Sequence, residues 1–274
     1  MNHDFQIVNH IVRVDGGILP ELLAGFECDP ESISALDPLD QEPICRIASA
    51  APTQVHGVER QTPDFSVSHV LTLTRDPSAV LLADDRFEHT LVRSCCPAGY
   101  SDLLLLAVYS RLAYFRTVFT HGALIRVPHY GGILFTGRSG VGKTTQATLW
   151  AQCANAEIIN GDKVFLAPSE EDPHTVYAYG SPWKGSSPYC VNCRVPLRAV
   201  IDLNRETEHY IRPLNELEAL SACMPAVFLP NWDVRLTEMV LETLDTLLPQ
   251  LSVYRMSCTK DANAVEMAAR ALGL

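Results

Sequence analysis

The chain has 274 residues, of which 47% are apolar and 19% charged, so it can bury a large core and does not have the composition of a disordered protein. Its formal net charge of −11 argues against a general nucleic-acid binder, which would need a basic face. No apolar run approaches the roughly 18 residues of a membrane helix, and no secretory signal is visible. The nine cysteines are scattered and odd in number, which favours reduced thiols and a cytoplasmic protein.

Residues 1–100 are predicted to form a β-rich accessory region. Strand-like stretches at 5–17, 65–76 and 78–94 are separated by turn residues. Residues 28–64 hold five of the 18 prolines and are predicted to be irregular. The acidic stretch 82–89, LADDRFEH, has side chains that could bind a metal ion, but we interpret it as a solvated hairpin tip.

Residues 101–274 are predicted to form an α/β domain. From Ser101, a plausible N-cap, the apolar spacing becomes helical. Strands and helices then alternate, which is typical of an α/β core. The expected strands lie at 123–127, 132–137, 157–167, 175–181, 197–204 and 251–258, and the expected later helices at 143–155, 214–224, 233–248 and 261–272.

A phosphate-binding loop is the most specific motif of the chain. GRSGVGKT at 137–144 matches G-x-x-x-x-G-K-[ST] completely, between an apolar strand and a helical pattern. Such a loop aims backbone N–H groups and a helix N-terminus at phosphate, while Lys143 reaches the β- and γ-phosphates and Thr144 binds Mg²⁺. A site for a nucleoside triphosphate is therefore predicted. Its residues are Gly137, Arg138, Ser139, Gly140, Val141, Gly142, Lys143, Thr144 and Thr145.

The partner motifs of two large P-loop classes are absent. The chain has neither the D-x-x-G and N-K-x-D of small GTPases nor the signature segment of ABC-type ATPases. It does have Asp162, 19 residues after Lys143, a spacing that fits one helix and a return strand. Asp162 would then lie at a strand's carboxyl end beside the phosphates, where it could hold Mg²⁺ or take a proton from a hydroxyl. The alternative is a simple turn aspartate in NGDK.

These motifs, in this order, resemble the HPr kinase-like family, whose nucleotide-binding core is related to phosphoenolpyruvate carboxykinase. HGALIRV at 121–127 resembles the His-Gly strand of the family, GRSGVGKTT its P-loop, and NGDKV the position of its Asp-Asp pair. YGSPWKG at 179–185 and VPLRAVIDL at 195–203 resemble segments of the stand-alone HPr-kinase-related proteins. The resemblance covers about residues 120–274 and implies an α/β P-loop core of the HPr kinase/phosphoenolpyruvate carboxykinase type.

The resemblance also implies a chemistry, because family members transfer phosphate from ATP to a serine hydroxyl. By this resemblance Asp162 is the base or a metal ligand, and His121 lies near the phosphates. Two positions depart from the family pattern: Gly161 replaces the first acid of the pair, and Thr145 replaces a glutamate. Both departures argue against the reverse, phosphorolytic reaction and against HPr as the substrate. Without the resemblance, His121 would be interpreted as a strand-start histidine bonded to backbone.

Three further side chains are candidates for substrate binding. They are Lys163 beside Asp162, and Trp183 and Lys184 in a Gly/Ser/Pro loop, where an exposed aromatic and a cation often serve recognition. A solvated lysine and a packed tryptophan are the plainer alternatives. The CVNC stretch at 190–193 has metal-like spacing but lacks the further ligands that a zinc site needs.

The expected function is an ATP- and Mg²⁺-dependent kinase whose acceptor is a hydroxyl, serine in a peptide or protein. The catalytic residues would be Asp162, Lys143 and His121, with Thr144 and Asp162 as metal ligands. The alternatives are a small-metabolite kinase and a non-catalytic ATP-binding module, in which Gly161 marks lost catalysis. Neither nucleic acid nor membrane is an expected partner, and a homo-oligomer is expected because related kinases are commonly oligomeric.

Overall fold

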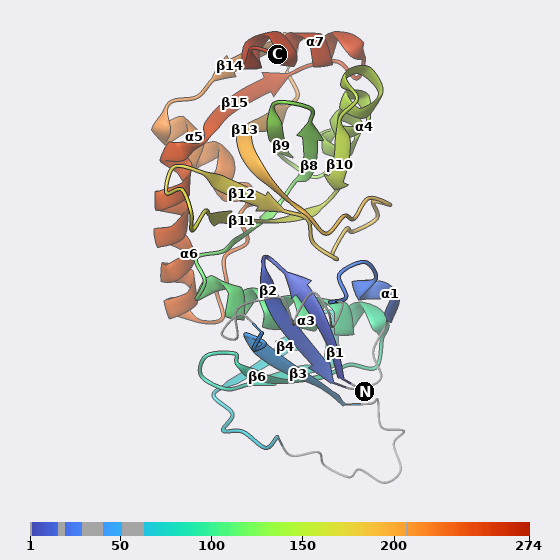
Figure 1. Ribbon diagram of the computed structural model, residues 1–274, viewed down its shortest axis with the longest axis vertical. Coiled ribbons are helices and arrows are strands. Elements are labelled where there is room, and N and C mark those ends of the chain that lie inside the picture. Colours follow the sequence, from blue (N-terminus) through green and yellow to red (C-terminus); the bar gives the residue numbers. More distant parts are fainter. Residues whose placement is uncertain (1, 16–19, 29–40, 51–62, 207) are drawn as a thin grey trace. The chain divides into compact units, whose positions relative to one another are not determined.

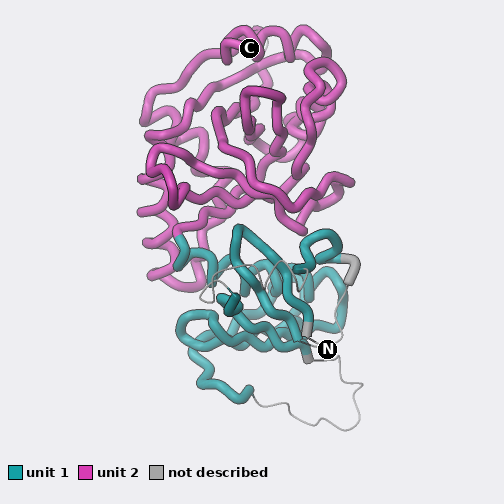
Figure 2. Tube along the Cα trace, viewed as in Figure 1, with its two compact units in different colours: residues 1–115 teal, residues 116–274 magenta. Residues whose placement is uncertain are grey.

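The computed structural model describes residues 2–15, 20–28, 41–50, 63–206 and 208–274. The chain is mixed α/β and divides into two compact units, Met1–Phe115 and Arg116–Leu274 (Figures 1 and 2). Among the described residues, no helix is long and apolar enough to cross a membrane.

The described residues of unit 1 form a six-stranded sheet with one long helix. The strand order is β1-β2-β3-β6-β5-β4, with parallel pairing at β2–β3 and β3–β6 and antiparallel pairing elsewhere. Helix α3 packs on β3, β5 and β6 through buried residues such as Leu104 and Val108. The elements are β1 (Asn2–Ile7), β2 (His10–Asp15), α1 (Pro20–Leu23), β3 (Cys45–Ala50), β4 (His69–Leu73), β5 (Asp76–Ala83), β6 (His89–Arg93) and α3 (Pro97–Ala113).

Helix α3 begins earlier than the sequence suggested and belongs to unit 1. Pro97 fits the first helical position because its missing N–H would be unpaired there, and the thiol of Cys96, rather than Ser101, caps the helix by accepting from the N–H of Gly99. The boundary between the units therefore falls after Phe115 instead of after residue 100. The physical reason is that the apolar face of α3 covers the sheet that precedes it in the chain.

Unit 2 contains a branched nine-stranded sheet. Its main path is β10-β8-β9-β13-β12-β11-β7, and β15 pairs with both β13 and β14. The first residues of β13 pair with β12, while its later residues lie between the parallel strands β9 and β15. The strands are β7 (Val118–His121), β8 (Ala123–Val127), β9 (Gly131–Thr136), β10 (Glu157–Asn160), β11 (Lys163–Pro168), β12 (Val176–Tyr179), β13 (Arg194–Asn204), β14 (Tyr210–Pro213) and β15 (Ser252–Ser257).

Helices cover the sheet of unit 2. Helices α4 and α7 pack on each other (Figure 1). Together with the sheet they form an apolar cluster that includes Phe135, Trp150, Ile201 and Val265. Helix α6 packs on β7 and β11, and α5 contacts β15. The bounds are α4 (Lys143–Ala154), α5 (Glu216–Cys223), α6 (Val234–Leu247) and α7 (Ala262–Leu272), with short 3₁₀ turns at Met224–Ala226 and Leu248–Gln250.

The expected strand at 157–167 is two strands. β10 pairs with β8, whereas β11 pairs with β7 and β12, so the chain changes partners at Gly161 and Asp162. Because β10 and β9 are both antiparallel to β8, they run in the same direction. The end of β10, and Asp162 just after it, therefore lie at the edge of the sheet where β9 ends.

Candidate functional site

The predicted phosphate-binding loop follows β9, whose last residue is Thr136. Gly137 and Gly142 have backbone φ angles of +123° and +125°, which residues other than glycine rarely adopt. A Cβ at Gly137 would lie 2.6 Å from the carbonyl oxygen of Leu203, so the loop passes tightly against β13. Helix α4 then starts at Lys143, and none of the described side chains caps its first turn. The N–H groups of that turn are thus open to an anion.

Lys143 is folded back over its own loop. Its ammonium group donates to the carbonyl oxygens of Gly137 (3.0 Å) and Arg138 (3.4 Å). Burial lowers the pKa of Lys143, and the nearby Asp162 carboxylate acts in the opposite direction. The lysine of the P-loop and the predicted base therefore share one electrostatic environment. Of the remaining loop residues, Arg138, Ser139, Gly140 and Thr144 are exposed, and Val141 and Thr145 are half-buried.

Asp162 is positioned by Asn160, a residue that the sequence analysis did not single out. The fully buried side chain of Asn160 accepts from the backbone N–H groups of Asp162 (2.8 Å) and Lys163 (2.9 Å). Its amide nitrogen donates to the carbonyl oxygen of Ser181 (2.8 Å). Since a buried amide at a strand end has few other partners, this bonding fixes the turn that presents Asp162. The turn propensity of NGDK was the only sequence signal for it.

The carboxylate of Asp162 lies between two basic side chains. The ammonium of Lys163 is 2.6 Å from Oδ2, and Nε2 of His121 is 3.3 Å from Oδ1. His121 comes from β7, which pairs directly with Lys163 of β11, and the N–H of Gly122 donates to the carbonyl oxygen of Asp162 (2.9 Å). Burial lowers the pKa of His121, Asp162 raises it, and the charges of Lys143 and Lys163 lower it further.

The loop 182–189 passes close to Asp162. A Cβ at Gly185 would lie 2.5 Å from Oδ2 of Asp162, and a Cβ at Gly161 would lie 2.0 Å from Oγ of Ser187. Ser187, which the sequence analysis missed, therefore occupies the space of any side chain at position 161. The position of Ser187 therefore leaves no space for an acidic side chain at position 161.

The two substrate candidates in this loop differ in exposure. Lys184 is exposed. Trp183 is only 4% exposed and meets Phe165 edge-on, with ring centroids 6.3 Å apart. This packing favours the structural interpretation of Trp183 over a substrate contact.

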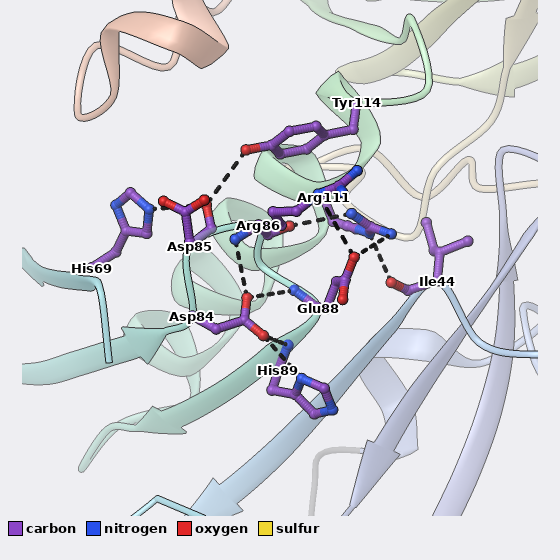
Figure 3. Close-up of polar contacts among 9 residues, drawn as sticks. All are labelled: Ile44, His69, Asp84, Asp85, Arg86, Glu88, His89, Arg111 and Tyr114. Carbon is purple, nitrogen blue, oxygen red and sulfur yellow. Dashed lines mark hydrogen bonds and ion pairs between the residues drawn. The ribbon is translucent and has the colours of Figure 1, made fainter. Parts of the chain in front are cut away.

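The acidic stretch of unit 1 is a hairpin connection between β5 and β6 (Figure 3). The Asp84 carboxylate accepts from the backbone N–H groups of Arg86 (3.2 Å), Glu88 (2.9 Å) and His89 (2.9 Å), and lies 2.9 Å from Nδ1 of His89. Arg111 of α3 forms an ion pair with Glu88 (3.2 Å). These acids organise a turn, and the described part of the chain holds no group of three or more His, Cys, Asp or Glu side chains suited to a metal ion.

The cysteines do not form disulfides: all nine are free. Burial raises the pKa of Cys190 and of Cys193, the two thiols of the CVNC stretch. Protonated, half-buried thiols are poor metal ligands and poor nucleophiles. The raised pKa values of these thiols therefore do not support a metal site at this stretch.

No family model matches the chain, and no curated protein matches it. A search of solved structures found the HPr(Ser) kinase/phosphatase from Coxiella burnetii, with a TM-score of 0.34 and 9% sequence identity. The match covers 56% of this chain and 94% of the other. The Coxiella burnetii protein is therefore a weak structural neighbour of this chain.

Proposed function

We propose that unit 2 binds ATP with Mg²⁺ and transfers the γ-phosphoryl group to a hydroxyl, that of serine in a peptide or protein. One observation carries the proposal: the Asp162 carboxylate, flanked by His121 and Lys163, follows β10 at the edge of the sheet where β9 leads into the loop of Lys143. Burial lowers the pKa of Lys143, and the charge of Asp162 partly offsets this effect. A carboxylate beside a phosphate-binding loop is the arrangement that phosphoryl transfer to a hydroxyl requires.

The residues present fit the ligands. The loop offers backbone N–H groups, the uncapped start of α4 and the Lys143 ammonium, which together are donors for a polyphosphate. The exposed Thr144 hydroxyl and the carboxylate oxygens of Asp162 are ligands of the kind that Mg²⁺ prefers. When bound, Mg²⁺ neutralises charge on the phosphate oxygens.

The residues of the chain then have distinct roles. Lys143 and the loop amides hold the β- and γ-phosphates, and Asp162 orients the acceptor hydroxyl and takes its proton. With glycine at 161, this single carboxylate serves as both base and metal ligand. His121, whose pKa is lowered by burial, lies 3.3 Å from the Asp162 carboxylate and holds it in place. Most of the rate would come from positioning and charge neutralisation.

We further propose that unit 2 has a P-loop core of the HPr kinase-like type, with unit 1 as an accessory region. Supporting this are the order of the His-Gly strand, P-loop and NGDKV, and the pairing that sets His121 beside Lys163. Exposed Lys184 and half-buried Lys163 are the basic side chains proposed to contact the acceptor. The cytoplasmic location and the homo-oligomer stay predictions.

The non-catalytic alternative also has an observation in its favour. Ser187 fills the space beside Gly161, so the turn cannot hold a second acid without moving the loop. Such a module would bind ATP tightly with no transfer or hydrolysis. A small-metabolite kinase would instead phosphorylate a small molecule and ignore peptides.

Two variants test the kinase proposal. Purified protein is incubated with γ-labelled ATP, Mg²⁺ and cell extract, and the label is located. We expect Lys143→Ala to abolish transfer, and Asp162→Asn to lower kcat by roughly two to four orders of magnitude with ATP still bound. Asp172→Asn, at an exposed turn of the same unit, is the matched control. Full activity of Asp162→Asn would remove the base assignment, and label on a small molecule would favour the metabolite kinase.

A further inference from the structure

Three parallel strands of unit 2 end side by side. β9, β13 and β15 are neighbours, with Asp202 opposite Thr136 and Asn204 opposite Ser257. The P-loop follows β9, so the connections after β13 and β15 emerge next to it. In open α/β sheets, ligands bind beyond the carboxyl ends of the strands.

The connection after β13 brings an arginine onto the P-loop. The guanidinium of Arg205 donates to the carbonyl oxygen of Gly140, and the N–H of Arg205 is held by Oδ1 of Asn204 (2.9 Å). A guanidinium has five N–H donors in one plane. After one bond to a carbonyl, its other N–H donors and its flat face are still available.

The connection after β15 brings a lysine to the same loop. A Cβ at Gly142 would lie 3.8 Å from Cε of Lys260. The connection is held against α4 because Nε2 of Gln146 donates to Sγ of Cys258 (3.1 Å) and to the carbonyl oxygen of Thr259 (3.4 Å). Lys260 is therefore anchored through the residues that precede it.

The two connections are also tied to each other. The N–H of Glu206 donates to Oγ of Ser257 (3.0 Å), and the Ser257 hydroxyl donates to the carbonyl oxygen of Glu206 (3.3 Å). Ser257 is only 1% exposed, so this bonding is shielded from water. Arg205 and Lys260 are thus held on one framework beside the P-loop.

The positive charges of the Arg205 and Lys260 side chains favour an anionic or electron-rich ligand. In the part of the chain that the structure describes, neither Arg205 nor Lys260 is in an ion pair with a carboxylate, although the chain carries a net charge of −11. The phosphates are already provided for by Lys143 and the loop amides. What remains of a nucleotide is the sugar and the base, whose π-face stacks on a guanidinium plane and whose oxygens and ring nitrogens accept hydrogen bonds.

We propose that Arg205 and Lys260 form the subsite for the nucleoside end of the bound triphosphate, with Arg205 against the base and Lys260 donating to the sugar or base. This inference rests on the proposed nucleotide binding at the P-loop. It divides the edge of the sheet into two sides: the acceptor side at Asp162 and the nucleoside side at Arg205 and Lys260.

The test compares ATP with inorganic tripolyphosphate, which has the phosphates but no nucleoside. Binding of each to the full chain is measured by calorimetry with Mg²⁺, for the wild type, for Arg205→Ala with Lys260→Ala, and for Arg270→Ala. Arg270 is an exposed cation of α7 and serves as the charge control. We expect the double variant to raise the Kd for ATP about tenfold or more and to change the Kd for tripolyphosphate no more than about threefold. The Arg270→Ala control should change neither Kd.

The outcomes separate the two proposals. An unchanged Kd for ATP in the double variant overturns the nucleoside subsite. An equal loss of affinity for ATP and tripolyphosphate overturns it too, because the two cations would then bind the phosphates or hold the loop in shape. Retained tripolyphosphate binding shows that the loop is still folded. If the wild type binds ATP with the expected pattern but transfers no phosphoryl group, the kinase proposal fails while the subsite stands.

Discussion

The imidazole of His121 is subject to two opposing influences. Burial and the ammonium groups of Lys143 and Lys163 favour its neutral form, whereas Asp162 favours its charged form. The net effect is a lowered pKa, so the folded chain resists protonation of His121 more than the unfolded chain does. Below the unfolded pKa of about 6.5 the unfolded state binds the extra proton, and this group makes the fold less stable.

We therefore predict that His121→Asn makes unit 2 less sensitive to acid. As the pH falls from about 7.5 to about 5.5, the free energy of unfolding should drop more for the wild type than for the variant. All three tryptophans lie in unit 2, so urea unfolding followed by tryptophan emission reports on this unit. The other histidines are common to both proteins and cancel in the difference. A wild type that gains stability over the variant in acid would show that the attraction of Asp162 outweighs burial.

Ser187 leaves no room for a side chain at Gly161. A Cβ at position 161 would lie 2.0 Å from Oγ and 2.4 Å from Cβ of Ser187. We predict that Gly161→Ala destabilises unit 2 by about 1–3 kcal/mol, the usual cost of overpacking, or displaces the loop 182–189. Urea unfolding measures the first effect, and faster hydrogen exchange in the loop measures the second.

A second substitution identifies the cause. Ser187→Gly removes both clashing atoms, so the double variant should recover part of the loss caused by Gly161→Ala. Strictly additive effects of the two substitutions would show that the clash is not what makes glycine necessary at position 161.

The glycine-rich loop between β9 and α4, and the turn that holds Asp162, could be predicted because each is encoded locally, by glycine spacing and by a turn sequence next to a strand. Asn160, Ser187 and Arg205 could not, because their importance arises from contacts with Ser181, Gly161 and Gly140. Such contacts depend on which strands become neighbours, and periodicity does not reveal this. The proposed roles of Asp162 and His121 stay predictions until they are tested.

The connection between β5 and β6 is organised around the carboxylate of Asp84. Asp84 accepts from three backbone N–H groups and from His89 (Figure 3). We predict that Asp84→Ala loosens this hairpin by about 1–3 kcal/mol, because the amides lose their acceptor. Asp84→Asn keeps one acceptor oxygen and should cost less. Hydrogen exchange of peptides covering 80–93 measures both, and equal protection in Asp84→Ala and the wild type would assign the turn to other contacts.

The main error of sequence reasoning at the level of elements concerns α3. Its helical periodicity was correctly located, but periodicity does not say which sheet its apolar face covers. The six-stranded sheet of unit 1 would leave residues such as Leu81 and Ile47 uncovered without it, and α3 packs there. For the same reason the strand pattern at 157–167 did not reveal the change of partners between β10 and β11.

Each unit has its own sheet and its own buried core, and every residue proposed to bind nucleotide belongs to unit 2. A unit with a complete core can in principle fold alone. We predict that the fragment 116–274 unfolds cooperatively in urea and binds ATP with a Kd within about threefold of the full chain. The boundary matters, because a fragment that begins at residue 101 carries most of α3 without the sheet that covers its apolar face. That longer fragment should aggregate more readily than 116–274. A 116–274 fragment that folds but no longer binds ATP would show that unit 1 contributes to the nucleotide site.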